Sequence, residues 1–364
     1  CVCVHVGCFV DVCDNEGRSA LYFASMRGDS VAIQSLLCEG ACVNMLTTNG
    51  VSIVSQVYRE SGLINESIEK RTHLREAVMM LLDEGADPNV STHPKPILRL
   101  AIAQADVLMV KTLIAKGSDL AYCDQLRQRT ALHDAGIHYA KCERTDSILC
   151  KWRTADSKAH GRSVVDFSIE KTTNALEVAI TLIDAGASVT SIDYEGLTIL
   201  HIAAGVKGDG AWALLDRIFK SDPNVDVNGL WRVSKTPLSI AVTAGNDKLA
   251  FELLNRGADP NTRLKNNRVT MCDLLEEHSL EVRTVEERLS LAIAMIKCGA
   301  DVLTLVPVQL ITTTPPPPTQ TPPTNDTTTT TGTTSTATTP TTTTPPTTTT
   351  ATMTGLLIDQ VYAH

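Results

Sequence analysis

The sequence predicts an all-α solenoid of helix-turn-helix repeats, each with a finger resembling a β-hairpin, followed by a disordered Thr/Pro-rich C-terminal tail. A glycine-containing motif recurs at intervals near 33 residues, as between Gly7 and Gly40, and such a period is the signature of stacked repeats. Apolar residues between these motifs are spaced by three and four, which places them on one face of a helix. The composition changes after Val308 and predicts the tail.

Residues 184–204 contain the motif most completely. Gly186 follows the end of one predicted helix and supplies the backbone freedom that a helix C-terminus needs. A polar finger follows with its tip at residues 193–196, and Thr198 then begins a second helix whose apolar face starts at Leu200. The Gly186 position recurs at Gly7, Gly40, Gly85, Gly117, Gly257 and Gly299, with Asn224 taking it once.

Both halves of this motif are repeated elsewhere. Residues 193–203 read Asp-Tyr-Glu-Gly-Leu-Thr-Ile-Leu-His-Ile-Ala, and residues 235–241 read Lys-Thr-Pro-Leu-Ser-Ile-Ala. Residues 81–89 read Leu-Leu-Asp-Glu-Gly-Ala-Asp-Pro-Asn. Residues 253–261 have the same sequence except that Asn-Arg stands in place of Asp-Glu. These segments resemble the ankyrin repeat, and about seven copies cover residues 1–303. The resemblance implies an α-solenoid that binds proteins.

The repeats divide the chain into four parts. Residues 1–13 match the end of a preceding repeat, so we expect an N-terminal truncation, and residues 14–303 hold the array. Residues 304–354 cannot bury enough apolar area to offset their ordering entropy, so we expect a disordered linker. An O-glycosylated stalk is the alternative for a secreted chain. Residues 355–364 form a short apolar tail.

The repeats differ in length, and three of them carry insertions. The second is 12 residues longer than the first, and its surplus near residues 63–73 is expected between its two helices. In the fourth repeat, 69 residues separate Gly117 from Gly186, and the surplus over residues 142–171 is polar. A third surplus lies near residues 278–286. Insertions in repeat proteins map to loops on one face and are often functional, with an unselected flexible loop as the alternative.

Charge and hydropathy restrict the class of partner. The formal net charge is −9 and the isoelectric point is near 5.5, which disfavours a nucleic-acid backbone as partner. The chain contains no run of 18 apolar residues, so no membrane-spanning segment is predicted. We therefore expect a monomer that binds a protein partner, without nucleic acid, membrane or cofactor.

The cysteines indicate a reducing compartment. Their number, eleven, is odd, and their spacing is not that of a small disulfide scaffold. Several stand beside core positions, where Cys behaves as a small hydrophobic residue. Cys1, Cys3, His5 and Cys8 have the residue types of metal ligands but lack paired spacing, so we favour the remnant of a repeat over a zinc site. We expect a cytoplasmic protein, with the nucleus as the alternative.

Two histidines are the residues most typical of an enzyme. His133 and His201 both follow a Thr-x-x-His pattern in which Thr130 or Thr198 caps the helix and the imidazole bonds a neighbouring finger. Ser239 takes the same position in a sister repeat, which argues against a shared reaction. No motif of nucleophilic, metal-dependent or phosphate-binding catalysis is present. We therefore expect no catalysis, the alternative being a pocket that joins His133 to the fourth-repeat insertion.

The functional surface is expected on the concave face, where finger tips and inner helices meet. Aromatic and arginine side chains dominate interface energetics. The predicted partner contacts are Tyr194, Glu195, Trp231, Arg232, Asp124 and Arg127. We predict a non-catalytic protein-binding scaffold. The alternative is a regulatory or targeting segment of a larger enzyme or signalling receptor.

Four asparagines end the second half of the motif, at Asn44, Asn89, Asn228 and Asn261. We expect them to tighten the turn that follows their own repeat. The resemblance implies a further property, that asparaginyl hydroxylases modify such residues.

Overall fold

The protein is described by a computed structural model. The structure describes residues 9–62, 67–90, 96–152, 164–232, 235–263, 269–270, 274 and 284–301. The chain divides into two compact units, Cys1–Ala258 and Asp259–His364, which are considered separately below. The predicted Thr/Pro-rich linker over residues 304–354, the apolar tail and the Cys1–Cys8 cluster lie outside the described residues.

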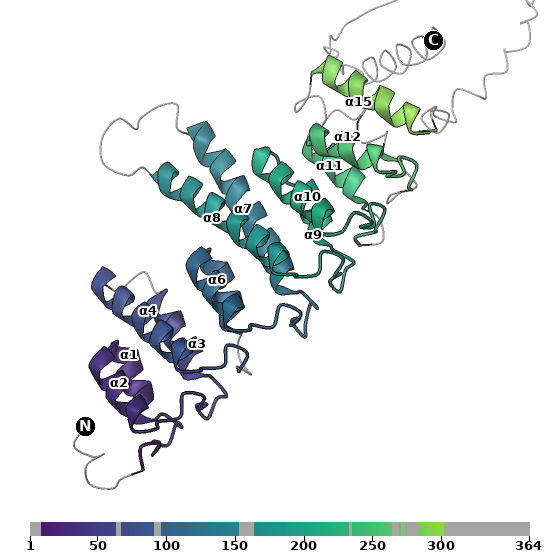
Figure 1. The fold of residues 1–364 in the computed structure, drawn as a ribbon. Helices are drawn as coiled ribbons and strands as arrows, with labels where there is room; N and C mark the ends of the chain where they lie inside the picture. Colours follow the sequence, from purple (N-terminus) through teal and green to yellow (C-terminus); the bar gives the residue numbers. More distant parts are fainter. Residues whose placement is uncertain are drawn as a thin grey trace, which may run out of the picture. The chain divides into compact units, whose positions relative to one another are not determined.

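Within the described residues the fold is helical, and the prediction of an α-solenoid is confirmed. The helices of the first unit are α1 (Ala20–Arg27), α2 (Ser30–Cys38), α3 (Ile53–Ser61), α4 (Ile68–Asp83), α5 (Ile97–Gln104), α6 (Val107–Ala115), α7 (Ala131–Trp152), α8 (Val164–Asp184), α9 (Ile199–Ala204), α10 (Asp209–Ser221), α11 (Pro237–Ala244) and α12 (Asp247–Asn255) (Figure 1). Each odd-numbered helix packs against the next even-numbered one, so each pair forms one repeat.

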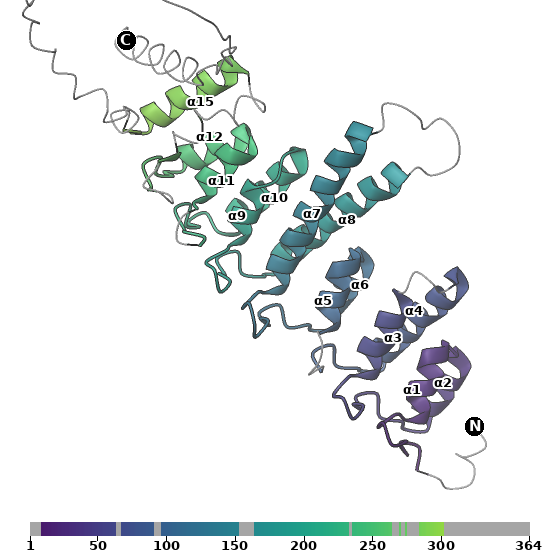
Figure 2. The ribbon, with the colours of Figure 1, turned by 180° about the vertical axis from the view of Figure 1, so that it is seen from behind.

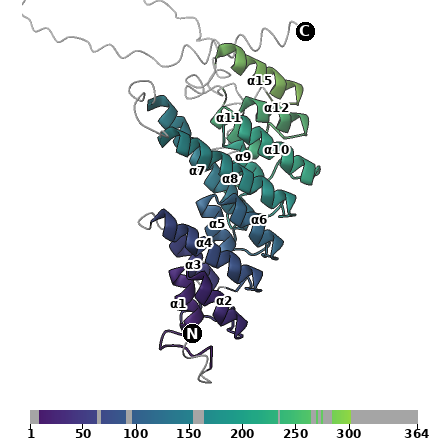
Figure 3. The same ribbon diagram turned by 60° about the vertical axis from the view of Figure 1, so that its left-hand side comes forward.

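The pairs stack in chain order. The inner helices α1, α3, α5, α7, α9 and α11 form a continuous row in which each contacts the next. In the outer row α2 contacts α4, and α8 contacts both α6 and α10. Figure 3 shows this succession of pairs along the first unit. The core therefore lies between neighbouring repeats as well as within them, as expected for a solenoid.

Short polar residues fix where the helices begin. Thr198 and Thr236 cap the inner helices α9 and α11, and in both cases the third residue of the helix bonds back to complete a capping box. The outer helices α6 and α12 begin at an acidic and an amide cap, Asp106 and Asn246. Each cap satisfies backbone N–H groups that the first turn of a helix leaves unpaired. The residue at the cap position therefore determines where each of these helices begins.

The recurring glycine ends the outer helices, as predicted. Gly186 follows α8 with a φ of 89°, in the left-handed region that residues other than glycine rarely adopt. Asn224 does not take this conformation, so its assignment to the glycine position was wrong. Helix α10 instead ends at Ser221 and is followed by Asp222, which has extended backbone directly before Pro223.

The fingers connect one repeat to the next. Finger 1, residues 13–19, closes with an isolated β-bridge between Cys13 and Ser19. Finger 2, residues 46–52, closes with one between Leu46 and Ser52. The Thr48 N–H donates to the Glu16 carbonyl at 2.9 Å, which joins these two fingers through their backbones. Figure 1 shows that the fingers project from the same side of the first unit.

The four asparagines join successive repeats instead of tightening their own turns. Asn89 donates through Nδ2 to the Gly117 carbonyl at 3.0 Å and accepts through Oδ1 from the Asp119 N–H at 2.7 Å. The same donation runs from Asn44 to Gly85, from Asn228 to Gly257 and from Asn261 to Gly299. The prediction of a local role missed this because the acceptor lies one repeat further along the chain.

The insertions lengthen helices, whereas loops had been expected. The surplus near residues 63–73 extends α4 to 16 residues, although residues 63–66 lie outside the described part. Much of the surplus over residues 142–171 continues α7 and α8, which have 22 and 21 residues. This pair extends beyond α6 and α10 (Figure 2). Helices α7 and α8 pack against each other, and the polar surplus continues both of them.

The cysteines lie outside the core. Of the six that the structure describes, Cys13 and Cys142 are half-buried, and Cys38, Cys42, Cys123 and Cys298 are exposed. This agrees with a place beside core positions for Cys42, which follows the buried Ala41. None of these six forms a disulfide.

The second unit has one long helix within its described residues, α15 (Val285–Lys297). Thr284 caps it with Glu287 in a capping box. Buried Arg288 donates through Nε to the Leu274 carbonyl at 3.2 Å. The insertion near residues 278–286 lies almost wholly outside the described residues.

Candidate partner-binding surface

Three consecutive fingers carry all the predicted contact residues. Finger 4 comprises residues 124–129, finger 5 residues 193–197 and finger 6 residues 231–235, of which 233 and 234 are not described. The predicted contacts are distributed two to a finger: Asp124 and Arg127, Tyr194 and Glu195, Trp231 and Arg232. The sequence motif therefore assigned them to equivalent places in successive repeats.

The backbones of these fingers are joined in the same way as those of fingers 1 and 2. The Tyr194 N–H donates to the Arg127 carbonyl at 2.9 Å, and the Arg232 N–H donates to the Glu195 carbonyl at 2.8 Å. A Cβ at Gly196 would overlap the Leu230 carbonyl, so only glycine permits this close approach of fingers 5 and 6. The six residues are thus held at fixed spacing along one edge.

Asp193 fixes the conformation of finger 5. Its Oδ1 accepts the N–H groups of Glu195 and Leu197, each at 2.9 Å, and its Oδ2 accepts Arg129 Nε at 3.1 Å. Burial by itself raises the pKa of Asp193, but these donors outweigh it and hold the pKa below its ordinary value. The carboxylate is therefore ionised near neutral pH and ties finger 5 to finger 4.

Glu195, Trp231 and Arg232 form one cluster between fingers 5 and 6. Glu195 Oε2 accepts Arg232 Nε at 2.8 Å and the Trp231 indole N–H at 3.3 Å. The Arg232 guanidinium and the Lys235 ammonium lie 5.1 Å and 5.5 Å from the Trp231 ring centre, within cation–π range. The hydrogen bond from Arg232, aided by that from Trp231, holds the pKa of Glu195 below its ordinary value. These three predicted contacts therefore also connect the two fingers.

Apolar side chains stand exposed at the same finger tips. Tyr194 is 78% exposed, and Leu126 beside Arg127 is 88% exposed. Leu230, at the start of finger 6, is 45% exposed. The apolar surface of these side chains is removed from water only if another molecule covers it. Leu126 and Leu230 were not among the predicted contacts, because the motif gives no preference at these positions.

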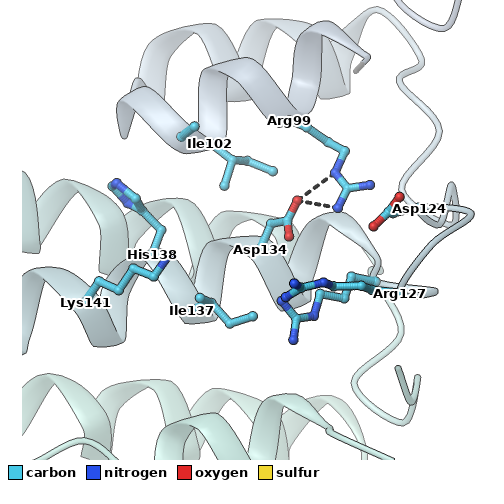
Figure 4. A pocket seen from close by; sticks show the side chains of 10 residues that line it. Arg99, Ile102, Asp124, Arg127, Asp134, Ile137, His138 and Lys141 are labelled. Carbon is cyan, nitrogen blue, oxygen red and sulfur yellow. Dashed lines mark hydrogen bonds and ion pairs between the residues drawn. The ribbon is translucent and has the colours of Figure 1, made fainter. Parts of the chain in front are cut away.

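A cavity of about 310 Å³ lies between finger 4 and the inner helices α5 and α7 (Figure 4). The predicted residues Asp124 and Arg127 line it. Arg99 on α5 and Asp134 on α7 form an ion pair at one wall. Sequence reasoning missed this pair, although one signal was present: Arg99 occupies the position that holds His133 in the next repeat.

His133 is buried, with 2% of its surface exposed, and both ring nitrogens are bonded. Nε2 lies 2.9 Å from the Leu197 carbonyl of the next finger, so it carries the proton and donates it. Nδ1 then accepts, and it lies 2.9 Å from Thr130 Oγ1 and 3.3 Å from the Thr130 N. The structure confirms the predicted bond between the imidazole and the next finger.

His201 repeats this arrangement in the fifth repeat. Its Nδ1 lies 2.7 Å from Thr198 Oγ1, and its Nε2 lies 3.0 Å from the Gly229 carbonyl. Burial lowers the pKa of both His133 and His201, and the carbonyl bonds only partly offset it. Both rings are therefore neutral near pH 7 and engaged in structure, which leaves neither nitrogen available to a substrate.

The described residues also bear on metal binding and on insertion into a membrane. Among the described residues, no three His, Cys, Asp or Glu side chains are grouped so that they could hold a metal ion. None of the helices in the described part has the length and apolar character needed to cross a lipid bilayer.

Known proteins share this architecture. A family model of the ankyrin repeat matches residues 234–266. The mouse protein "Ankyrin repeat and MYND domain-containing protein 1" is 31% identical over 269 residues, which is 68% of this chain and 28% of that protein. Its human counterpart is 30% identical over 65% of this chain and 26% of its own length. The chain thus spans about a quarter of the length of these relatives.

Solved ankyrin-repeat structures are also similar. The ankyrin repeat domain of Bcl-3 is 16% identical, with a TM-score of 0.49, over 76% of this chain and 99% of that domain. The family match and the relatives agree with the capped helix pairs and joined fingers of the first unit. The chain is an ankyrin-repeat protein.

Proposed function

We propose that the protein is a non-catalytic scaffold that binds a protein partner on the face formed by its fingers and inner helices. Ankyrin repeats are in general protein–protein interaction modules. The observation that carries the proposal is the row of exposed tips on fingers 4 to 6, where Leu126, Tyr194 and Leu230 stand beside charged residues on joined backbones. An apolar row with a polar border is the usual composition of a protein interface.

The contact residues contribute in two ways. Tyr194 and Leu126 supply apolar area, since no described side chain covers them. Trp231, Arg232 and Glu195 present a rigid cluster, so little conformational entropy is lost when a partner binds it. Asp124 and Arg127 add charge at the mouth of the cavity.

Affinity capture with the full-length chain tests this proposal. Tyr194→Ala and Leu126→Ala together are expected to reduce recovery of a captured partner about tenfold or more, as for other exposed aromatic and apolar anchors. Leu108→Ala on the outer helix α6 is the matched control, because Leu108 is 72% exposed but lies on the opposite element of its repeat. Equal loss with the control and the finger variants would contradict the proposed face.

The class of partner follows from charge. The net charge of −9 opposes binding to a nucleic-acid backbone, so we expect a protein partner. We also expect the scaffold to be a monomer. We place the protein in the cytoplasm, with the nucleus as the alternative. Imaging of the tagged full-length chain tests the location, and light scattering tests the monomer.

One observation favours a second candidate function, in which the array is the targeting or regulatory part of a longer protein. The matched segment makes up 28% of the mouse relative, whose name includes a second domain. The same finger row would then dock that longer protein on its partner. Sequencing of transcripts upstream of Cys1 separates the two candidates.

A further inference from the structure

The cavity beside finger 4 combines apolar walls with one buried ion pair. Ile102 on α5 and Ile137 on α7 line it, and the ion pair of Arg99 with Asp134 joins the same two helices. Figure 4 shows these four side chains around the cavity. We call this cavity the finger-4 pocket.

The ion pair keeps one donor and one acceptor unused. Arg99 is 6% exposed, and Asp134 Oδ2 accepts its Nε at 2.6 Å and also pairs with its Nη2. Within the part of the chain that the structure describes, neither Arg99 Nη1 nor Asp134 Oδ1 forms a hydrogen bond, and both lie outside the dashed bonds of Figure 4. The pair therefore offers both an N–H donor and an acceptor oxygen to a third group.

The other charges of the finger-4 pocket are matched. Arg129 donates through Nε to Asp193 Oδ2 at 3.1 Å. Asp124 and Arg127 contribute one charge of each sign from finger 4. Lys141 also lines the pocket, but it has an interaction of its own and is left out of this balance. The lining thus gives no preference for a ligand with a net charge.

His138 on the wall of the pocket adds no charge near neutral pH. Burial lowers its pKa, and the nearby Lys171 and Lys141 lower it further. The imidazole is thus neutral, and the balance of charges in the finger-4 pocket stands.

The unused donor and acceptor restrict the group that fits. A carboxylate only accepts hydrogen bonds, so it would leave Asp134 Oδ1 unmet and would lie against a like charge. An ammonium or guanidinium group only donates, so it would leave Arg99 Nη1 unmet. A carboxamide carries a donor and an acceptor on separate atoms and has no net charge to desolvate.

We propose that the finger-4 pocket binds the carboxamide side chain of a Gln or Asn in the partner protein. This inference rests on the proposed scaffold function and names the residue type that one part of its face selects. The volume of about 310 Å³ is large enough for one such side chain, whose methylene groups would contact Ile102 and Ile137. Leu126, exposed on finger 4, offers apolar contact to the flanking residues of the partner.

Peptide selection on the full-length chain tests this proposal. A random 12-residue display library is selected on the wild type and on Ala103→Trp. Ala103 is an exposed residue of the pocket lining, so the larger side chain fills the pocket and leaves the ion pair in place. The wild type is expected to enrich peptides with Gln or Asn next to apolar residues, and Ala103→Trp is expected to lose that enrichment.

Ala115→Trp is the matched control. Ala115 is an exposed alanine at the end of the outer helix α6, in the same repeat as Ala103, and the change of side chain is identical. This variant is expected to keep the enrichment of carboxamide peptides. Loss with Ala115→Trp as large as with Ala103→Trp would overturn the assignment to the pocket.

Synthetic peptides separate the carboxamide from other groups. In a selected peptide, replacing its Gln by Glu or by Met is expected to weaken binding about tenfold, because Glu cannot donate to Asp134 and Met makes neither bond. Equal binding of the Glu peptide, selected peptides without Gln or Asn, or no enriched peptide would overturn the inference. Partner capture that depends on Tyr194 but is unchanged by Ala103→Trp would leave the proposed function standing and remove only this inference.

Discussion

The fifth and sixth repeats begin with the same local structure but are joined to their neighbours differently. Thr198 caps α9 with His201 in the third helical position, and Thr236 caps α11 with Ser239 in that position. His201 also reaches the Gly229 carbonyl of the next finger, 28 residues further on. Ser239 bonds only the Thr236 N–H and carbonyl within its own turn. Of these two repeats, both use this position to close a helix, but only the fifth, which holds histidine there, also uses it to reach the next repeat.

The largest expected effect comes from removing the connecting ring. His201→Ala is expected to lower the free energy of unfolding by about 2–3 kcal/mol, because it leaves the Gly229 carbonyl and the Thr198 N–H without the imidazole and opens a cavity. Ser239→Ala is expected to cost only about 1 kcal/mol, since it removes a local cap. Urea denaturation of both variants measures the difference. Equal losses would show that the histidine has no role beyond its own turn.

Acid should weaken the histidine-joined repeats. The folded pKa values of His133 and His201 are depressed below 6.5, so below that pH the unfolded chain binds protons that the folded chain does not. Stability present above pH 6.5 is therefore lost as pH falls.

Denaturation at pH 7.5 and 5.5 measures this loss. His138 titrates in the same direction, so the comparison uses variants. His133→Gln with His201→Gln should be less stable at pH 7.5 but show a flatter pH profile. A profile as steep as that of the wild type would assign the acid sensitivity to other groups.

The smallest expected effect concerns the asparagine connections. Asn89→Ala removes two bonds to the next repeat and is expected to cost about 1 kcal/mol. Asn224→Ala is the matched control, since Asn224 is exposed and its side chain makes no described bond to another repeat. Thermal melts of the two variants compare them directly. A melt of Asn89→Ala that coincides with that of Asn224→Ala would confine the connection between repeats to the histidines and fingers.

The fold was predictable from sequence wherever one local signal decided it. Gly186 needs a left-handed backbone, and Thr198 needs an N–H three residues ahead, so both can be read from a single repeat. The length of α7 could not be read in this way. Its polar surplus continues the helix, and α7 packs against α8, a contact between segments that periodicity does not connect. Asn224 misled the prediction because its turn chemistry resembles that of glycine.

The candidate surface was predictable only in part. The motif placed Tyr194 and Trp231 at finger tips, but it could not show that Glu195 accepts bonds from Trp231 and Arg232 of the next finger. The cavity beside finger 4 is lined by Arg99, Arg129 and Asp134 from three elements, and no linear pattern relates them. An arginine in the histidine position was the single available signal.

Site-specific photo-crosslinking on the full-length chain tests the central claim most directly. A photoreactive residue replaces Tyr194 or Leu126 on the fingers, or Leu108 on the outer helix α6, and all three positions are highly exposed. The account predicts one protein partner crosslinked from Tyr194 and from Leu126, with none from Leu108. A partner crosslinked from Leu108 and from neither finger would contradict it.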